Sequence, residues 1–277
     1  MVSVMSFIII QLPPGDYVDS YIRNLQLQGG TVNEAQKADL EAQYGLDKSL
    51  PEQYLVWISN IVLRGDFGNS FRYQQPVEQI LVERVPRTIA ISLASILITW
   101  VIAVPLGILS ALKQYSFWDY LVAFVSFVGL SVPAFLLALV LMYFVYAQTG
   151  WFVTGLFSPE YRTAAWSIDK LIDLLKNIWL PLLVLPIVST GGIIRVLRAS
   201  LLDELRKQYV TTARAKGLSE RLLILRYPVR IAVNPLISTI GWMLPAVVGG
   251  EVVVAKVLNL PTTGPVLLEA IQSQDMY

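Results

Sequence analysis

The sequence predicts an all-α integral membrane protein, and three observations carry that prediction. Of its 277 residues, 55% are apolar and only 15% are charged, against roughly a quarter charged in ordinary soluble domains. Several uncharged runs reach the ~18 residues that indicate a bilayer-spanning helix. The charges gather in polar segments between these runs, and the net charge of +1 does not favour a nucleic-acid partner.

Residue types that are missing from the sequence exclude several classes of function. The chain has no Cys and no His, which removes disulfides, thiolate nucleophiles, Cys/His zinc sites and the commonest general base. It also has no phosphate-binding loop of the G-x-x-x-x-G-K-[ST] type, so a partner must do any nucleotide-driven work. We therefore expect no catalytic residue, no metal site and no cofactor bound by this chain. An intramembrane enzyme would need a nucleophile–base pair within a span, and no span holds one.

The N-terminal third divides into an apolar segment and a long polar region. Residues 1–12 are too short to cross a bilayer at about 1.5 Å per residue, so we interpret them as part of a first spanning helix. An interfacial segment is the alternative. Residues 13–87 hold ten acids and seven bases, and we expect an extracytoplasmic helical region there. Its predicted helices cover 15–28, 31–44 (with a Thr31–Glu34 capping box), 51–63 and an amphipathic stretch at 77–85.

Four uncharged runs follow, and each is interpreted as a membrane span. They are separated by a short polar link at 113–119, by a larger loop at 148–176 and by a basic loop. Tryptophans around the larger loop are typical of an interfacial belt, and we expect that loop on the exterior. Within it, residues 169–176 are predicted as a short surface helix. The predicted spans cover residues 88–112, 120–147, 177–194 and 231–250.

Prolines and small residues within these spans predict local features of the helices. Pro133 predicts a kink, which is either a plain structural bend or a gating hinge. The run from Ser189 to Gly192 predicts a close helix–helix approach, because small side chains let backbones come together in lipid. Arg195 and Arg198 end their span, and we expect them to snorkel to the cytoplasmic interface.

The basic loop at 195–230 fixes the predicted orientation of the chain. It holds nine Lys or Arg against three acids, and Lys and Arg resist translocation, so the loop and the N-terminus are expected in the cytoplasm. At its centre, Ala213 and Gly217 are four residues apart and would share an almost bare face of a short helix. That face would fit a partner's groove, with Arg214 and Lys216 meeting acidic groups, and Gly217 would end the helix. The alternative is a capped cytoplasmic turn whose basic residues reflect only the resistance of Lys and Arg to translocation.

The last part of the chain holds a further candidate for a functional charge. Glu251 follows the span at 231–250, and an ionisable group near bilayer depth is a candidate pathway residue. The alternatives are a place at the outer interface or a pair with Lys256. Residues 258–277 would start outside and include an amphipathic helix at 265–272, so we expect one more spanning helix beyond them. The count is then six spans, or five without that helix.

Five stretches spread along the chain carry a resemblance to a known family. They are LPPGD at 12–16, YGLDKSLPEQYLVWISNIVLRGDFGNSF at 44–71, RVPRTIAISLAS at 84–95, GLSVPAFLLALVLMYFV at 129–145 and RVLRASLLDELRKQYVTTARAKGLSE at 195–220. In this order they resemble the B-type transmembrane subunit of dipeptide/oligopeptide ABC importers. The resemblance implies a type I ABC importer-like permease fold, with the transmembrane permease domain over 88–277.

The resemblance also implies a role for the centre of the basic loop. Thr211, Thr212 and Ala213 stand where the permease superfamily has Glu-Ala-Ala, and Gly217 stands at its glycine. Because Thr211 replaces the glutamate, any contact that needs its carboxylate is put in question. The loop would hold a coupling helix that docks into a groove of an ATPase subunit. Its residues are Tyr209, Thr211, Thr212, Ala213, Arg214, Ala215, Lys216, Gly217 and Leu218.

The segment after the last predicted span departs from the family's pattern. Pro261 and Gly264 remain from that pattern, whereas Ala255 stands at the place of an acid. We expect a pathway or exterior gate that involves Pro261 and Gly264 and is built differently from the family's. Glu251 or Lys256 would compensate for the missing acid.

The resemblance implies a subunit that forms half of a translocation pathway in a bacterial or archaeal cell membrane. Its partners would be a second homologous permease, two ATPase subunits that carry ATP and Mg, and an extracytoplasmic solute-binding protein. Relatives of that family take nickel chelates or oligosaccharides, which stay open beside di- and oligopeptides. An ion-driven secondary transporter is the alternative class, but the sequence shows no internal repeat and only Glu251 as a candidate for a buried charge.

Overall fold

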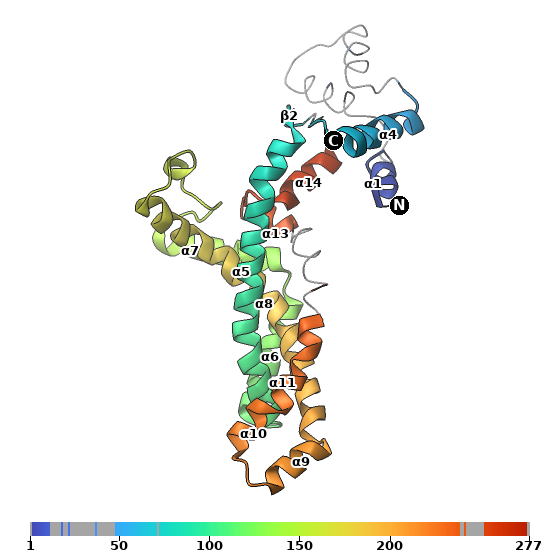
Figure 1. Cartoon of the computed structure of the whole chain (residues 1–277). Coiled ribbons are helices and arrows are strands. Elements are labelled where there is room, and N and C mark those ends of the chain that lie inside the picture. Colours follow the sequence, from blue (N-terminus) through green and yellow to red (C-terminus); the bar gives the residue numbers. More distant parts are fainter. Residues whose placement is uncertain are drawn as a thin grey trace. The chain divides into compact units, whose positions relative to one another are not determined.

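The structure is a computed structural model that describes residues 2–11, 18, 22, 37, 48–70, 72–238, 241 and 252–275. In these residues the regular structure is helical apart from one two-stranded hairpin, which confirms the predicted all-α class (Figure 1). The chain divides into two compact units, a larger one of Arg87–Gly264 and a smaller one of Met1–Pro86 with Pro265–Tyr277.

Among the described residues of the N-terminal third, the smaller unit contains two short helices. Helix α1 (Val2–Gln11) packs Phe7 against Tyr54 of α4 (Leu50–Ser59), with ring centroids 5.4 Å apart. A capping box of Ser49 and Glu52 begins α4, and a π-helical turn (Asn60–Arg64) extends it. Gly65 then stops the helix with a φ of 65°, so the helix predicted over 51–63 is confirmed. The helices predicted over 15–28 and 31–44 lie outside the described residues.

A short hairpin in the smaller unit is tied to the C-terminal segment. Strands β1 (Asn69–Ser70) and β2 (Gln75–Pro76) pair antiparallel. The carboxylate of Asp275 accepts hydrogen bonds from the Ser70 hydroxyl (2.5 Å) and from the Arg72 backbone N–H (3.0 Å). This segment follows helix α14 (Thr263–Gln272), which confirms the helix predicted over 265–272.

Two helices in the described part of the chain are long and apolar enough to cross a membrane. They are α5 (Val77–Leu112, 36 residues) and α8 (Ile168–Leu205, 38 residues). The helices predicted at 77–85 and 169–176 are present, but each forms the first turns of one of these long helices and continues into the span. Pro86 does not end α5, since a proline removes only one backbone donor and neighbouring helices can satisfy the freed carbonyl.

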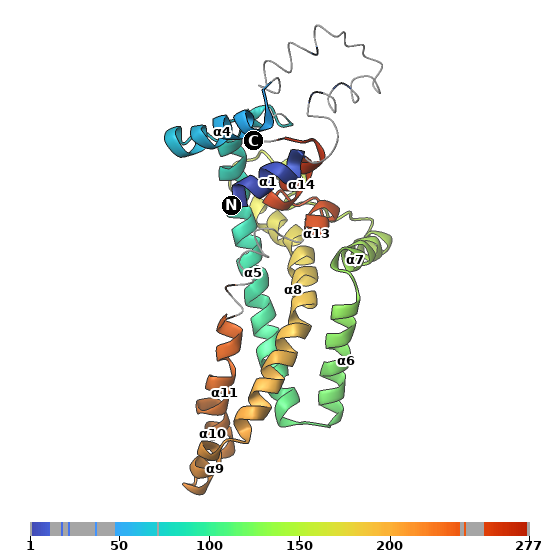
Figure 2. The ribbon, with the colours of Figure 1, turned by 90° about the vertical axis from the view of Figure 1, so that its right-hand side faces the viewer.

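The predicted span at 120–147 is broken in the middle. Helix α6 (Phe117–Ser131) follows a link that is shorter than predicted, and Val132 and Pro133 separate it from α7 (Ala134–Thr149). The two helix axes differ by 98°, so the expected kink is present but is a near right angle. Figure 2 shows α7 leaving α6 in this way. The pair is either a broken span or a re-entrant segment.

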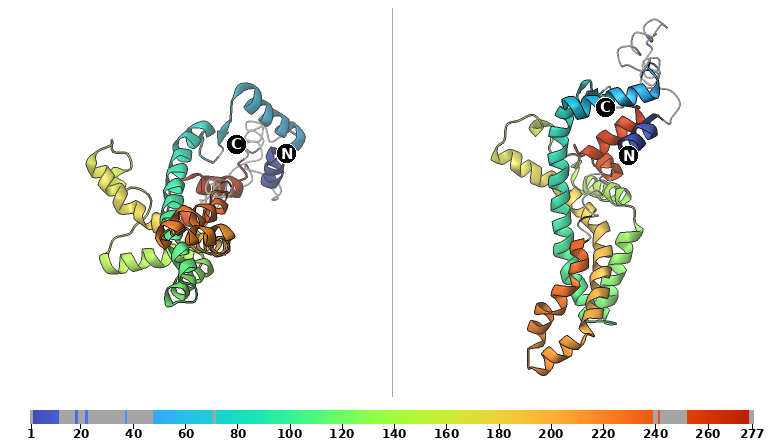
Figure 3. Two further views of the ribbon diagram at one scale, coloured as in Figure 1. Left: turned by 60° about the horizontal axis from the view of Figure 1, so that its bottom comes forward. Right: turned by 45° about the vertical axis from the view of Figure 1, so that its right-hand side comes forward.

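Helices α5, α6 and α8 lie side by side in the larger unit (Figures 2 and 3). Glycines permit the approach: a Cβ on Gly191 of α8 would lie 2.6 Å from the Ser126 carbonyl oxygen of α6, and a Cβ on Gly107 of α5 would lie 3.0 Å from Leu197 of α8. The close approach predicted for residues 189–192 is therefore confirmed at Gly191. The core between these helices contains Ala103, Ala111, Val122, Ile193, Ile194, Leu197, Leu201, Ala232 and Leu236.

A second core lies on the other side of the bend, where α7 packs on the first half of α8. Helix α13 (Val252–Val257) completes it with Val254, Ala255 and Leu258. The loop between α7 and α8 includes a 3₁₀ turn (Pro159–Tyr161). Helix α11 (Pro228–Ala232) and residues 234–238 occupy the start of the span predicted at 231–250, whose remainder lies almost wholly outside the described residues.

Candidate functional site

A hairpin of two short helices follows α8 and contains the predicted coupling residues (Figure 1). Helix α9 (Gln208–Ala215) begins two residues after α8, and α10 (Glu220–Arg226) folds back beside it. Apolar residues of the two helices pack against one another. Val210, Ala213 and Leu223 are buried against one another, with Tyr209, Leu218 and Ile224 packed at the edge. We call the end of the larger unit that carries residues 195–230 the basic end.

The exposed side of α9 carries short and basic side chains. Thr211, Thr212, Ala215 and Lys216 are exposed, whereas Ala213 faces α10. Gly217 has a φ of 80° and follows the helix, which confirms it as the terminating residue. The prediction that Ala213 and Gly217 share a bare face is wrong, because one packs inward and the other lies beyond the helix end. The short surface that α9 does present is the one around its threonines.

Two polar contacts stiffen the hairpin. Arg214 of α9 pairs with Glu220 of α10, so this cation is engaged within the chain and not left for a partner's acidic groups. The pair lowers the pKa of the Glu220 carboxyl and raises the pKa of the Arg214 guanidinium. The Tyr209 hydroxyl donates to Glu204 over 2.6 Å; partial burial, and then this carboxylate, raise the pKa of Tyr209 to about 12.

The two predicted gate residues that the structure describes lie in a packed segment. A Cβ on Gly264 would lie 3.3 Å from the Val252 Cα, so a larger side chain would push α13 away. Beside Gly264, the Thr263 backbone N–H donates to the Thr88 hydroxyl over 2.9 Å, whereas Pro261 is partly exposed. Glu251 lies outside the described residues. Ala255, at the place of the family's acid, is buried in the apolar core that α13 completes, where an unpaired acid would be costly.

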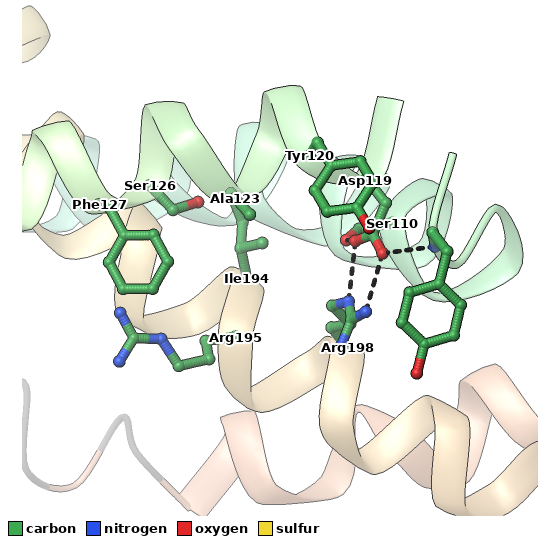
Figure 4. Close-up of a pocket in the computed structure, with 10 residues that line it drawn as sticks. Ser110, Asp119, Tyr120, Ala123, Ser126, Phe127, Ile194, Arg195 and Arg198 are labelled. Atoms are coloured by element: carbon green, nitrogen blue, oxygen red, sulfur yellow. Dashed lines mark hydrogen bonds and ion pairs between the residues drawn. The ribbon is translucent and has the colours of Figure 1, made fainter. Parts of the chain in front are cut away.

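A buried ion pair at the basic end is the main feature that the sequence patterns do not reveal. Asp119 of α6 is 5% exposed, and two nitrogens of the Arg198 guanidinium on α8 donate hydrogen bonds to its carboxylate over 2.9 and 2.8 Å (Figure 4). Arg198 is thus paired within the chain, and its place at the cytoplasmic interface stays a prediction. Both residues line a cavity of about 310 Å³ whose other walls include Phe127 and Arg195, with the Arg195 guanidinium 4.9 Å from the centre of the Phe127 ring.

A second polar cluster fixes the loop that precedes α8. The Asp173 carboxylate accepts from the backbone N–H (2.8 Å) and the hydroxyl (2.6 Å) of Ser158. Lys170 is 6% exposed; its ammonium donates to the Ala164 carbonyl and lies 4.9 Å from the centre of the Phe157 ring. These contacts bury the side of α8 that carries Lys170 and Asp173, whereas Leu171, Ile172 and Leu175 stay exposed, as the predicted surface helix at 169–176 requires. Among the described residues, no three Asp or Glu side chains gather as a metal site would require.

The long apolar helices define a membrane-embedded, helical protein. The chain belongs to the family of binding-protein-dependent transport system inner membrane components, whose model matches residues 103–277. It is 32% identical over 275 residues to the oligopeptide transport system permease protein AppB of Bacillus subtilis, covering 99% of this chain and 83% of the relative. It is 35% identical, with the same coverage, to a putative peptide permease protein of Brucella suis. A probable peptide ABC transporter permease protein of Sinorhizobium fredii is 32% identical over 276 residues, or 99% of this chain and 83% of that protein.

Proposed function

We propose that this chain is the permease subunit of an ATP-driven importer for di- and oligopeptides. The observation that carries the proposal is the family membership, joined to relatives over nearly the whole chain that are named as peptide or oligopeptide permeases. The chain forms one half of the translocation pathway and catalyses no chemistry itself. Nickel chelates and oligosaccharides have no specific support in the described residues.

Helix α9 is the element that couples this subunit to an ATPase. It is short and rigidly held by α10, and it directly follows one of the two long spans. Its exposed threonines present little side-chain bulk, so the helix can enter a groove, while Lys216 lies at the rim. The excess of Lys and Arg in the segment 195–230 supports a cytoplasmic place for this end, and with it a cytoplasmic N-terminus.

The remaining partners follow from the role of a single permease subunit. A second, homologous permease supplies the other half of the pathway, and two ATPase subunits bind ATP and Mg on the cytoplasmic side. An extracytoplasmic binding protein delivers the solute onto the regions 13–87 and 148–177. The pathway itself, including any gate formed by Glu251, Pro261 and Gly264, binds no cofactor.

The mechanism is a free-energy link between two distant sites through a two-state element. ATP binding closes the ATPase pair, and the groove that holds α9 moves with it. Because α9 is fixed to α8 by two residues of chain and to α10 by its apolar contacts, the displacement passes into the long helices. The spans then switch from an inward-facing to an outward-facing arrangement.

Co-purification tests the coupling role of α9. Tagged permease is isolated with its native partners, and wild type is compared with Ala215→Arg and Gly217→Arg. We expect an ATPase subunit to co-purify with wild type and to be lost from both variants. The matched control is Leu222→Arg, which adds the same side chain at an exposed position of α10 and should retain the ATPase.

Transport by the purified assembly tests the substrate. Proteoliposomes receive the binding protein and an isotope-labelled mixture of peptides of two to five residues, and mass spectrometry identifies what accumulates with ATP. ATP-dependent uptake of peptides from the mixture supports the proposal. An assembly without an ATPase, despite folded permease, would favour an ion-driven transporter instead.

A further inference from the structure

One carboxylate joins three helices at the basic end of the larger unit (Figure 4). Asp119 accepts hydrogen bonds from the Ser110 hydroxyl near the end of α5, from the Tyr115 backbone N–H at 2.9 Å, and from two nitrogens of Arg198. The two-pronged contact with Arg198 fixes distance and orientation together, because the planar guanidinium matches the carboxylate. The sequence therefore places a specific junction where α5, α6 and α8 meet.

From this junction, α6 and α8 stay in contact in one antiparallel register. Seven residues along α6 from Asp119, the Ser126 carbonyl faces Gly191, which lies seven residues back from Arg198 on α8. Three residues further along α6, a Cβ on Gly129 would lie 3.1 Å from the Ile187 carbonyl oxygen. The ion pair and the two glycine contacts thus form a single seam between the two helices.

Both ends of the seam lie where the backbone changes direction. Just beyond Gly129, α6 ends at Ser131 and α7 departs at 98°. At the other end, α8 passes into α9 through Arg206 and Lys207. A movement of α9 can therefore reach the bend through α8 and the contacts that hold α8 to α6.

We propose that Asp119 and Arg198 are positioning residues that lock α6 to α8, so that displacement of α9 reaches the α6–α7 bend as one rigid movement. This proposal rests on the proposed function, since it takes α9 to be the element that an ATPase displaces. The glycine contacts prevent the helices from moving closer, but nonpolar contacts alone do not stop them from sliding. The ion pair supplies that restraint at the end nearest to α9.

The first test measures the coupling of ATP hydrolysis to uptake in the assembled transporter. The variants Asp119→Asn and Arg198→Gln remove one charge each, and Arg195→Gln is the control, since it lies on the same helix against an aromatic ring. We expect all three to retain the ATPase subunits. Uptake of the labelled peptide mixture per ATP hydrolysed should fall about tenfold in the first two variants and stay near the wild-type value in the control.

A second test observes the seam directly and needs no ATPase. The chain has no cysteine, so spin labels can be placed at Val125→Cys on α6 and Ala199→Cys on α8, two exposed positions. We expect one narrow distance distribution in the wild-type background. The same labels should give a broad distribution in Asp119→Asn and in Arg198→Gln.

Unchanged uptake per ATP in both charge variants would overturn the proposal, and so would unchanged label distances. Absence of ATP-driven uptake in wild type would reject the proposed function instead, and the label distances would still decide whether the pair locks the helices. If the neutral variants do not accumulate in the membrane, Arg198→Lys replaces them, because it keeps the charge and loses the two-pronged contact. A wild-type uptake ratio in that variant would equally overturn the proposal.

Discussion

Gly191 lies where α8 meets the backbone of α6, and its neighbour Gly192 faces open space. A Cβ added at Gly191 would lie 2.6 Å from the Ser126 carbonyl oxygen and 3.2 Å from Leu130, whereas a Cβ added at Gly192 has no atom within 4 Å. The two glycines share the same helix and the same surrounding backbone. Their alanine variants therefore form a matched pair that differs only in this contact.

The expected difference can be worked from the distances. A carbon–oxygen contact relaxes at about 3.3 Å, so the two helices must separate by roughly 0.7 Å to admit the methyl group of Gly191→Ala. The obstacle is a backbone atom, which cannot rotate away as a side chain would. Overpacking of this kind costs about 1–3 kcal/mol. Both variants gain the same helix propensity, roughly 0.8–1 kcal/mol over glycine, so their difference isolates the contact.

Unfolding in detergent measures that difference. The purified chain in mixed micelles is titrated with SDS and followed by the fluorescence of its seven tryptophans. Gly191→Ala should unfold with a free energy about 1–3 kcal/mol below that of Gly192→Ala, and Gly129→Ala, whose contact is 3.1 Å, should fall between them. Agreement of the Gly191 and Gly192 variants within about 0.3 kcal/mol would refute the close α6–α8 contact.

Three other polar side chains carry predictions that can be checked singly. Arg198→Met should lower the free energy of unfolding by about 3 kcal/mol, measured in the same titration. This is the low end of the range for buried ion pairs, because the Arg198 side chain is 29% exposed. Adding Asp119→Asn to this variant should restore part of the lost stability, because it removes the unpaired charge. The raised pKa of Tyr209, about 12, means that folding favours the neutral phenol, so its contribution to the free energy of unfolding is complete below pH ~10 and is lost as the pH rises toward 12. The fall of that free energy over this pH range should therefore be smaller in Tyr209→Phe than in wild type, measured by the same titration. Asp173→Ala removes the acceptor that holds the loop before α8, so limited proteolysis there should accelerate about tenfold, whereas the exposed Asp169→Ala should leave it unchanged.

The positions of the helices are the part of the fold that the sequence predicts best. The uncharged run at 88–112 lies wholly within α5, and the helix predicted over 51–63 is α4 with its final turn. These signals are local, because an apolar run or a helical spacing of apolar residues acts within a few residues of where it stands. Their prediction therefore needs no knowledge of the rest of the chain.

Helix continuity could not be predicted in the same way. Lys170 and Asp173 make residues 169–176 resemble an exposed surface helix, yet both side chains are buried at the start of α8. Their partners are a carbonyl at Ala164 and the N–H and hydroxyl of Ser158, which lie in an irregular loop. A charge pattern shows that a residue is polar but not whether a loop will fold over it.

The coupling segment shows a similar limit. A run of small residues predicts that α9 approaches something closely, but it does not tell a partner's groove from a neighbouring helix of the same chain. In the structure Ala213 makes the intramolecular contact with α10, and the threonines are left outside. The position of α9 and its termination at Gly217 were predictable from the sequence. Which side of α9 is buried and which is exposed depends on the packing of α10.

The α6–α8 seam indicates how such contacts can be sought in other membrane sequences. In lipid there is no hydrophobic force between helices, so association depends on small residues and polar pairs, and each of these is ambiguous by itself. Asp119 reads as part of a polar link, and Gly191 as one of several small residues in its span. Taken as antiparallel partners, however, the spacing from Asp119 to Gly129 nearly equals that from Arg198 back to Ile187. An acid and a glycine on one span can thus match a base and a close-contact residue on another span, at nearly equal separations and in opposite directions. Such a match carries more information about helix contacts than any of these residues alone.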